Sequence, residues 1–72
     1  MTSHEAGESQ RDAMKSLIHE IRNPLNTISV SAELAKLQIE TGKPTSAILK
    51  SLDRIIEECR QCSRILTANN DQ

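Results

Sequence analysis

The chain has 72 residues, of which 9 are basic and 10 acidic, and it contains no Phe, Tyr or Trp. Its formal net charge of -1 argues against binding to nucleic acid or to an anionic membrane surface. No apolar run approaches the roughly 20 residues that a spanning helix needs, and no signal-peptide segment is visible. We therefore expect a cytoplasmic domain without direct membrane contact, although a longer parent protein could be membrane-anchored.

Residues 1–10 are polar and aperiodic, and we expect a flexible lead-in there. From Ala13 onward, apolar residues recur at spacings of three and four, which predicts an amphipathic helix over about residues 11–41. The predicted apolar seam consists of Met14, Leu17, Ile21, Leu25, Ile28, Ala32, Ala35 and Ile39. Leu34 and Leu37 lie off this seam and indicate a second apolar face toward the end of the helix.

A turn is predicted at about residues 42–45. Gly42 suits the left-handed residue that ends a helix, and Pro44 suits the start of a new one. A second helix is predicted over about residues 46–67, followed by a flexible tail over 69–72. Its seam consists of Ile48, Leu52, Ile55, Cys59, Cys62 and Leu66.

The predicted fold class is therefore all-α, an antiparallel two-helix hairpin over residues 11–68. Two helices pressed together leave part of each broad apolar stripe in water, whereas pairing two hairpins into a four-helix bundle buries the remainder. A domain this small also needs a staple or a partner for stability. We therefore expect a homodimer. On periodicity alone, a coiled-coil hairpin without any chemistry explains the same pattern.

One stretch of the first helix is unusual for a purely structural element. At about 100° per residue, His19 lies almost opposite the apolar seam and should project into solvent. Pro24 interrupts an otherwise regular helical pattern and should bend the helix, since it leaves the carbonyl of Glu20 without its usual donor. Ala at that position would stabilise a helix by about 3 kcal/mol relative to Pro, so the bend is expected to have a use.

The stretch His19-Glu20-Ile21-Arg22-Asn23-Pro24-Leu25-Asn26 resembles the H-box of the histidine kinases. That pattern is His-Glu, a variable apolar residue, Arg, Thr or Asn, Pro and Leu, and the chain matches every position. The helix-turn-helix layout over about residues 10–68 also resembles the dimerisation and histidine-phosphotransfer domain of that family.

The resemblance implies a role for each matching residue. His19 would be the nucleophile that attacks the γ-phosphate of ATP, and Glu20 the base that takes its proton. Asn23 would position water to hydrolyse the phosphoaspartate of a receiver domain. Arg22 would support phosphate charge or docking, and Pro24 would supply the bend.

The resemblance also implies partners, namely a separate ATP-binding catalytic domain and a response-regulator receiver domain. We expect no cofactor or metal site within this chain, with ATP and Mg²⁺ entering through the catalytic domain, and hence no autonomous kinase activity. Two alternatives stay open: a free-standing phosphotransfer relay, and a degenerate interaction module without catalysis. The Cys59-Cys62 pair lacks the further ligands of a zinc site and is predicted to consist of buried free thiols.

Overall fold

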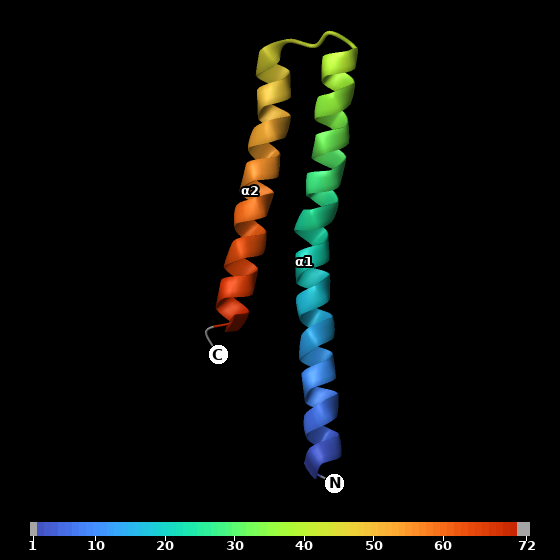
Figure 1. Ribbon diagram of the computed structural model, residues 1–72, viewed down its shortest axis with the longest axis vertical. Helices are drawn as coiled ribbons and strands as arrows, with labels where there is room; N and C mark the ends of the chain where they lie inside the picture. The colour runs from blue at the N-terminus through green and yellow to red at the C-terminus, as the bar shows by residue number, and fades with distance from the viewer. Residues whose placement is uncertain (1, 71–72) are drawn as a thin grey trace.

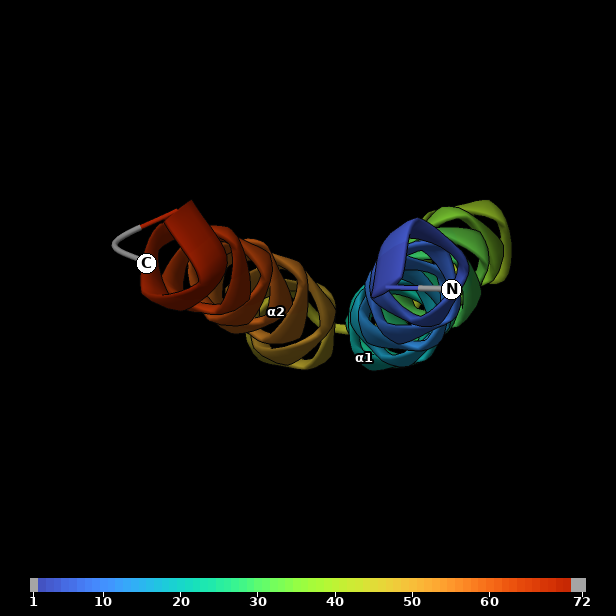
Figure 2. The ribbon, with the colours of Figure 1, turned by 90° about the horizontal axis from the view of Figure 1, so that it is seen from below.

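The protein is an antiparallel pair of helices joined by one tight turn (Figure 1). A computed structural model describes residues 2–70, with side chains described for residues 11–69. Helix α1 spans Thr2–Glu40 and helix α2 spans Thr45–Asn70, which confirms the predicted all-α hairpin. The radius of gyration is 17.6 Å, whereas a compact domain of this length would have about 11 Å. The molecule is a rod one layer thick, with the two helices side by side (Figure 2).

The helices reach further toward both termini than their periodicity indicates. α1 begins at Thr2 rather than at residue 11, and α2 ends at Asn70 rather than at residue 67. The flexibility predicted for residues 1–10 and 69–72 concerns motion and stays a prediction. Part of it falls on residue 1 and residues 71–72, which lie outside the described residues.

The C-terminus of α1 ends in a left-handed glycine. Gly42 has a φ of 71°, and its N–H donates to the carbonyl of Ile39 at 3.2 Å. The N–H of Lys43 donates to the carbonyl of Gln38 at 2.8 Å. This pair of hydrogen bonds is the Schellman motif, which satisfies carbonyls that the last turn of a helix would leave without donors.

Pro44 directly precedes the second helix. Its carbonyl accepts hydrogen bonds from the N–H groups of Ala47 and Ile48 at 3.0 and 3.3 Å. The left-handed Gly42 ends α1, and the chain reverses within four residues, 41–44, before α2 starts at Thr45. The turn lies one residue earlier than the predicted 42–45.

The contact between the helices, here called the hairpin seam, follows a heptad pattern of buried and half-buried side chains. It consists of Leu17, Ile21, Pro24, Ile28, Ser31, Ala35 and Gln38 on α1, and of Ile48, Ser51, Ile55, Glu58, Cys62 and Ile65 on α2. Toward the turn the seam is polar and small, and the hydroxyl of Ser51 donates to Oε1 of Gln38 at 2.8 Å. Small side chains let the helices approach closely, but they bury little apolar surface.

About half of the predicted apolar seam of α1 faces α2 in the single hairpin, and burial of the rest by a second hairpin stays a prediction. Leu17, Ile21, Ile28 and Ala35 do face α2, whereas Met14, Leu25, Ala32 and Ile39 are exposed. On α2, Leu52, Cys59 and Leu66 are likewise exposed. The apolar stripe is wider than one partner helix can cover, so half of it faces away from the hairpin seam.

Met14 is in heptad register with the seam residue Ile21. The other exposed residues, with Ile18 and Ile56, form a second surface, here called the outer stripe. On both helices its members follow hairpin-seam residues by one position, as Ile18 follows Leu17 and Ile56 follows Ile55. One position is about 100° of rotation. Because the helices are antiparallel, the same sense of rotation brings both halves of the outer stripe to one face of the hairpin. Residues that precede the hairpin seam by one position lie on the opposite face.

Candidate functional site

A groove between the helices lies on the face opposite the outer stripe. Its volume is about 570 Å³, and it is open to solvent along one side. Two walls line it: Glu20, Asn23, Pro24 and Thr27 from α1, and Glu57, Glu58, Gln61 and Ile65 from α2. We call this the H-box groove, because three of its residues belong to the predicted site. Three carboxylates and two amides give the groove an acidic, hydrogen-bonding lining without any Lys or Arg.

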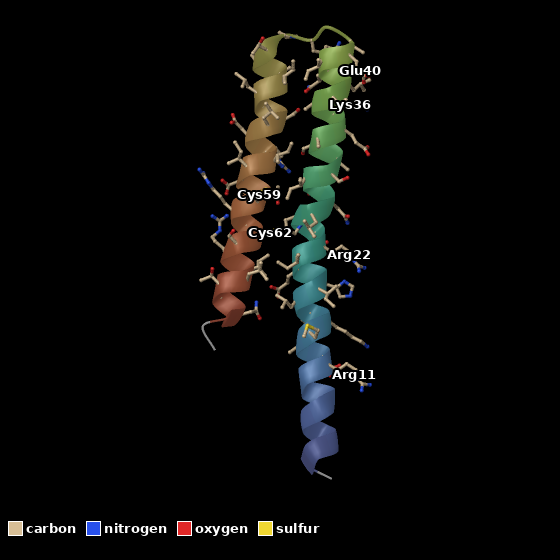
Figure 3. The ribbon with its side chains drawn as sticks, in the orientation of Figure 1. Arg11, Arg22, Lys36, Glu40, Cys59 and Cys62 are labelled. Atoms are coloured by element: carbon tan, nitrogen blue, oxygen red, sulfur yellow. The ribbon has the colours of Figure 1, made fainter. Side chains whose placement is uncertain are left out.

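The predicted site residues divide between the groove and the outer side of α1. Glu20 and Asn23 line the groove, and Pro24 is buried at its base. His19 and Arg22 are exposed and do not line the groove. Arg22 projects away from α2 (Figure 3). His19 thus stands beside the groove, on a part of α1 that a large partner can approach without meeting α2.

Pro24 belongs to the hairpin seam, a position that sequence reasoning did not assign to it. Helix α1 continues through it without interruption. Its ring packs toward α2, while its missing N–H leaves the carbonyl of Glu20 without the normal helical donor. One turn on, the hydroxyl of Thr27 donates to the carbonyl of Asn23 at 3.3 Å, so side-chain hydrogen bonding supplements the backbone beside the proline. The predicted bend at Pro24 stays a prediction.

The α2 wall of the groove carries a network centred on Arg64. Its Nη2 donates to Oε1 of Glu57 at 3.1 Å and to Oε1 of Gln61 at 2.9 Å, and its Nε donates to the same Gln61 oxygen at 3.3 Å. Arg60 lies 4.0 Å from Glu57. All these groups are exposed, so the ion pairs contribute little to stability. They do restrict the orientations of Glu57 and Gln61.

Glu58 is a charged residue in a hairpin-seam position. Its side chain is 21% exposed, and Nε of Arg54 lies 3.6 Å from its Oε1. Neither Glu58 nor its neighbours Glu57 and Gln61 was among the predicted site residues. Glu58 carried a usable signal, since a carboxylate spaced in register with Ile55 and Cys62 interrupts an apolar heptad. Gln61 carried no such signal in the sequence, because an exposed glutamine on a helix is ordinary.

A second hollow continues the groove toward the turn and shares Thr27 with it. Its α1 side includes the exposed apolar residues Val30 and Leu34, and its α2 side carries Lys50 and Arg54. The groove face is therefore acidic beside the H-box and basic nearer the turn. Leu34, which lay off the predicted seam, belongs to this face.

The two cysteines lie on different surfaces, and both thiols are free. Cys62 is half-buried in the hairpin seam, whereas Cys59 is exposed in the outer stripe, so the prediction that both are buried is wrong for Cys59 in the single hairpin. Residue 59 directly follows a seam residue, which turns its side chain away from α1. Both residues are labelled on α2 in Figure 3.

Among residues 2–70, neither helix is long and apolar enough to cross a membrane. Comparison with protein families gives one finding: the model of the His Kinase A (phospho-acceptor) domain matches residues 9–70. The match covers both helices, the turn and the H-box groove. Comparison with curated proteins and comparison with solved structures each gave no match.

Proposed function

Because the chain belongs to the His Kinase A (phospho-acceptor) domain family and serves as the phosphoacceptor domain of a histidine kinase, we propose that His19 carries the phosphate. The chain has one other histidine, His4, which lies in the predicted lead-in rather than in an H-box pattern. The observation that carries the proposal is the exposed position of His19 beside the H-box groove. An imidazole that must meet a nucleotide-binding domain and then a receiver domain needs such access.

Glu20 is proposed as the general base. A lone pair on one ring nitrogen of His19 attacks the γ-phosphorus of ATP, the P–N bond forms, and the P–O bond to the departing ADP breaks. The proton on the other ring nitrogen passes to the Glu20 carboxylate, which restores a neutral ring in the phosphohistidine. The residues are adjacent in sequence and therefore about 100° apart on the helix, a separation that a flexible glutamate side chain can span.

Asn23 and Arg22 are proposed as supporting residues with different partners. Asn23 lines the groove one turn after His19, so its amide can hold a water or an oxygen of the receiver close to the phosphate. Arg22 lies outside the groove, where a guanidinium can meet phosphate oxygens or an acidic docking surface. Pro24 is proposed to bend α1 so that these groups are presented together.

The outer stripe is proposed as the homodimer interface. Domains of this family homodimerise, and they act with kinase catalytic domains and receiver domains. Among the residues with described side chains no large side chain is fully buried, and the buried apolar residues are Pro24 and Ala35. A second hairpin that covers the outer stripe supplies the missing core and completes a four-helix bundle. A folded monomer in sedimentation equilibrium at micromolar concentration would contradict this interface.

The proposed reaction sequence places ATP and Mg²⁺ on a separate catalytic domain and the final acceptor aspartate on a receiver domain. This chain provides the histidine, the base and the docking surface. With Asn23 holding a water molecule, the same groove would also take part in hydrolysing the receiver's phosphoaspartate.

Phosphorylation of the chain by phosphoramidate tests the proposal without a partner. Intact mass is measured before and after mild acid, for the wild-type chain and for His19→Gln, with His4→Gln as the matched control. We expect an acid-labile phosphate on the wild type and on His4→Gln and none on His19→Gln. A phosphate that persists in His19→Gln would overturn the assignment. No phosphate on a folded wild-type dimer would favour a degenerate interaction module.

A further inference from the structure

Lys15 lies on the same side of α1 as His19. It precedes His19 by four residues, so the two side chains are neighbours on the helix surface, with Cβ atoms about 5 to 6 Å apart. It also precedes Arg22 by seven residues, which places both within about 20° of one another around the helix axis. Because Arg22 projects away from α2, Lys15 lies on that side as well (Figure 3). His19 therefore has one cationic residue about a turn before it and another about a turn after it.

The direction of helical side chains favours a contact between Lys15 and a phosphate on His19. Each Cα–Cβ bond of a helix tilts toward the N-terminus, so a side chain covers the turn that precedes its own Cα. The imidazole of His19 accordingly extends over the turn that starts at Lys15, and a phosphoryl group on the ring would lie over the same turn. Four methylene groups give the lysine ammonium the reach and freedom to meet that group.

Lys15 is accessible for this contact. Lys15 and His19 are both exposed, and neither lines the H-box groove. The ion pairs within residues 11–69 all lie on α2, so no carboxylate in that range holds Lys15. Of the acidic residues nearby, Glu20 lines the groove, and Asp12 lies about 10 Å before His19 along the helix axis. A phosphate on His19 would thus meet a cation before it meets a carboxylate on this side of α1.

We propose that Lys15 is a catalytic residue that contacts the phosphoryl oxygens during transfer to His19 and in the phosphohistidine. This inference rests on the proposed phosphorylation of His19. The ammonium donates hydrogen bonds to the phosphoryl oxygens and offsets their negative charge while the phosphorus moves from the donor to the ring nitrogen. Lys15 keeps its proton and forms no covalent bond, and the ring proton still passes to Glu20. The alternative is that Lys15 only docks an acidic surface of the catalytic domain.

Phosphoramidate separates contact with the phosphate from docking of a protein. In this reaction a ring nitrogen of His19 attacks the phosphorus, the P–N bond of the donor breaks, and ammonia leaves. No catalytic domain is present, so a residue that only docks such a domain has no effect on the rate. The second-order rate constant of phosphorylation is measured on the full chain by intact mass, at several salt concentrations, for the wild type, Lys15→Gln and Lys15→Arg.

We expect Lys15→Gln to lower the rate constant about fivefold, as the loss of one exposed charged contact implies. Lys15→Arg keeps the charge and the donors, and its rate constant should stay within about twofold of the wild-type value. Added salt should slow the wild type, because it screens the attraction between Lys15 and the anionic donor. The same salt should slow Lys15→Gln less.

Lys43→Gln is the matched control. It makes the same change in net charge at an exposed position in the turn, about 30 Å from His19 along α1. We expect the wild-type rate constant in this variant. An unchanged rate in Lys15→Gln, or an equal loss in both glutamine variants, would overturn the inference while the role of His19 stands. A slower Lys15→Gln whose dimer is weakened in sedimentation equilibrium would also overturn it. No phosphate on His19 of the folded wild-type chain would overturn both proposals.

Discussion

The two faces of the hairpin differ sharply although each lies one residue away from the same heptad seam. The face that follows the seam is the outer stripe, with Ile18, Leu25 and Ile39 exposed and a matching apolar row on α2. The face that precedes the seam holds Glu20, Asn23 and Gln61 and forms a groove. A shift of one residue thus separates a surface suited to assembly from a surface suited to chemistry.

The difference shows how two helices can serve two purposes without a core of their own. An apolar face is stable only when something covers it, whereas a polar groove must stay open for a partner. Because the two faces point in opposite directions, covering the first with a second hairpin leaves the second accessible. His19 projects from α1 away from α2, and dimerisation through the outer stripe does not require its burial.

The largest expected effect comes from placing a charge on the assembly face. Leu25→Asp puts two carboxylates into the proposed dimer interface, one from each subunit, and should weaken dimerisation at least about a hundredfold. Sedimentation equilibrium over a range of concentrations measures the change. The expected product is a partly unfolded monomer, since the hairpin alone buries so little.

Leu37→Asp is the matched control for this comparison. Leu37 is 55% exposed and Leu25 is 51% exposed, but Leu37 precedes a seam residue and lies off the outer stripe. We expect Leu37→Asp to leave the dimer intact. Equal weakening of dimerisation by both variants would mean that the dimer interface is not confined to the outer stripe.

Pro24→Ala tests whether the proline lowers the stability of the fold while it supports phosphate transfer from His19. The change restores a backbone hydrogen bond to the carbonyl of Glu20 and should stabilise the folded dimer by about 1 to 3 kcal/mol, reduced by the packing that the proline ring loses. Thermal unfolding followed by circular dichroism measures this gain. We expect slower phosphate transfer from His19 in the same variant; unchanged transfer kinetics would remove the functional interpretation of the bend.

The smallest expected effect concerns the turn end of the seam, away from both faces. Ser51→Ala removes the hydroxyl that donates to Gln38 at 2.8 Å and should destabilise the protein by about 1 kcal/mol. Urea unfolding is the suitable measurement, and Ser63→Ala, at an exposed position on the same helix, is the control. Phosphorylation of His19 should not change in either variant, and a change would indicate that the turn end is coupled to the site.

Much of the fold and part of the site could be predicted from local chemistry. Gly42 and Pro44 locate the turn because a left-handed residue and a missing N–H have few other uses at a helix boundary. The H-box is recognisable because the histidine, proline and polar residues occur at matching positions along one helix. The α2 wall could not be predicted in this way, since Gln61 becomes notable only through its position across from Asn23.

The sequence by itself therefore determined the two helices, the turn, the amphipathic character and the H-box with His19. These features depend on backbone geometry and on spacings within one helix, which residue order specifies directly. Only the tertiary structure decided which part of the wide apolar stripe faces α2, that Pro24 and the polar residues Ser31 and Ser51 lie in the seam, and that α2 contributes to the groove. The physical reason is that the rotation of one helix against another depends on how the side chains of both helices pack together, which spacings within one helix do not specify. In this hairpin the small residues Ser31, Ala35 and Ser51 are buried, whereas larger apolar residues beside them are exposed.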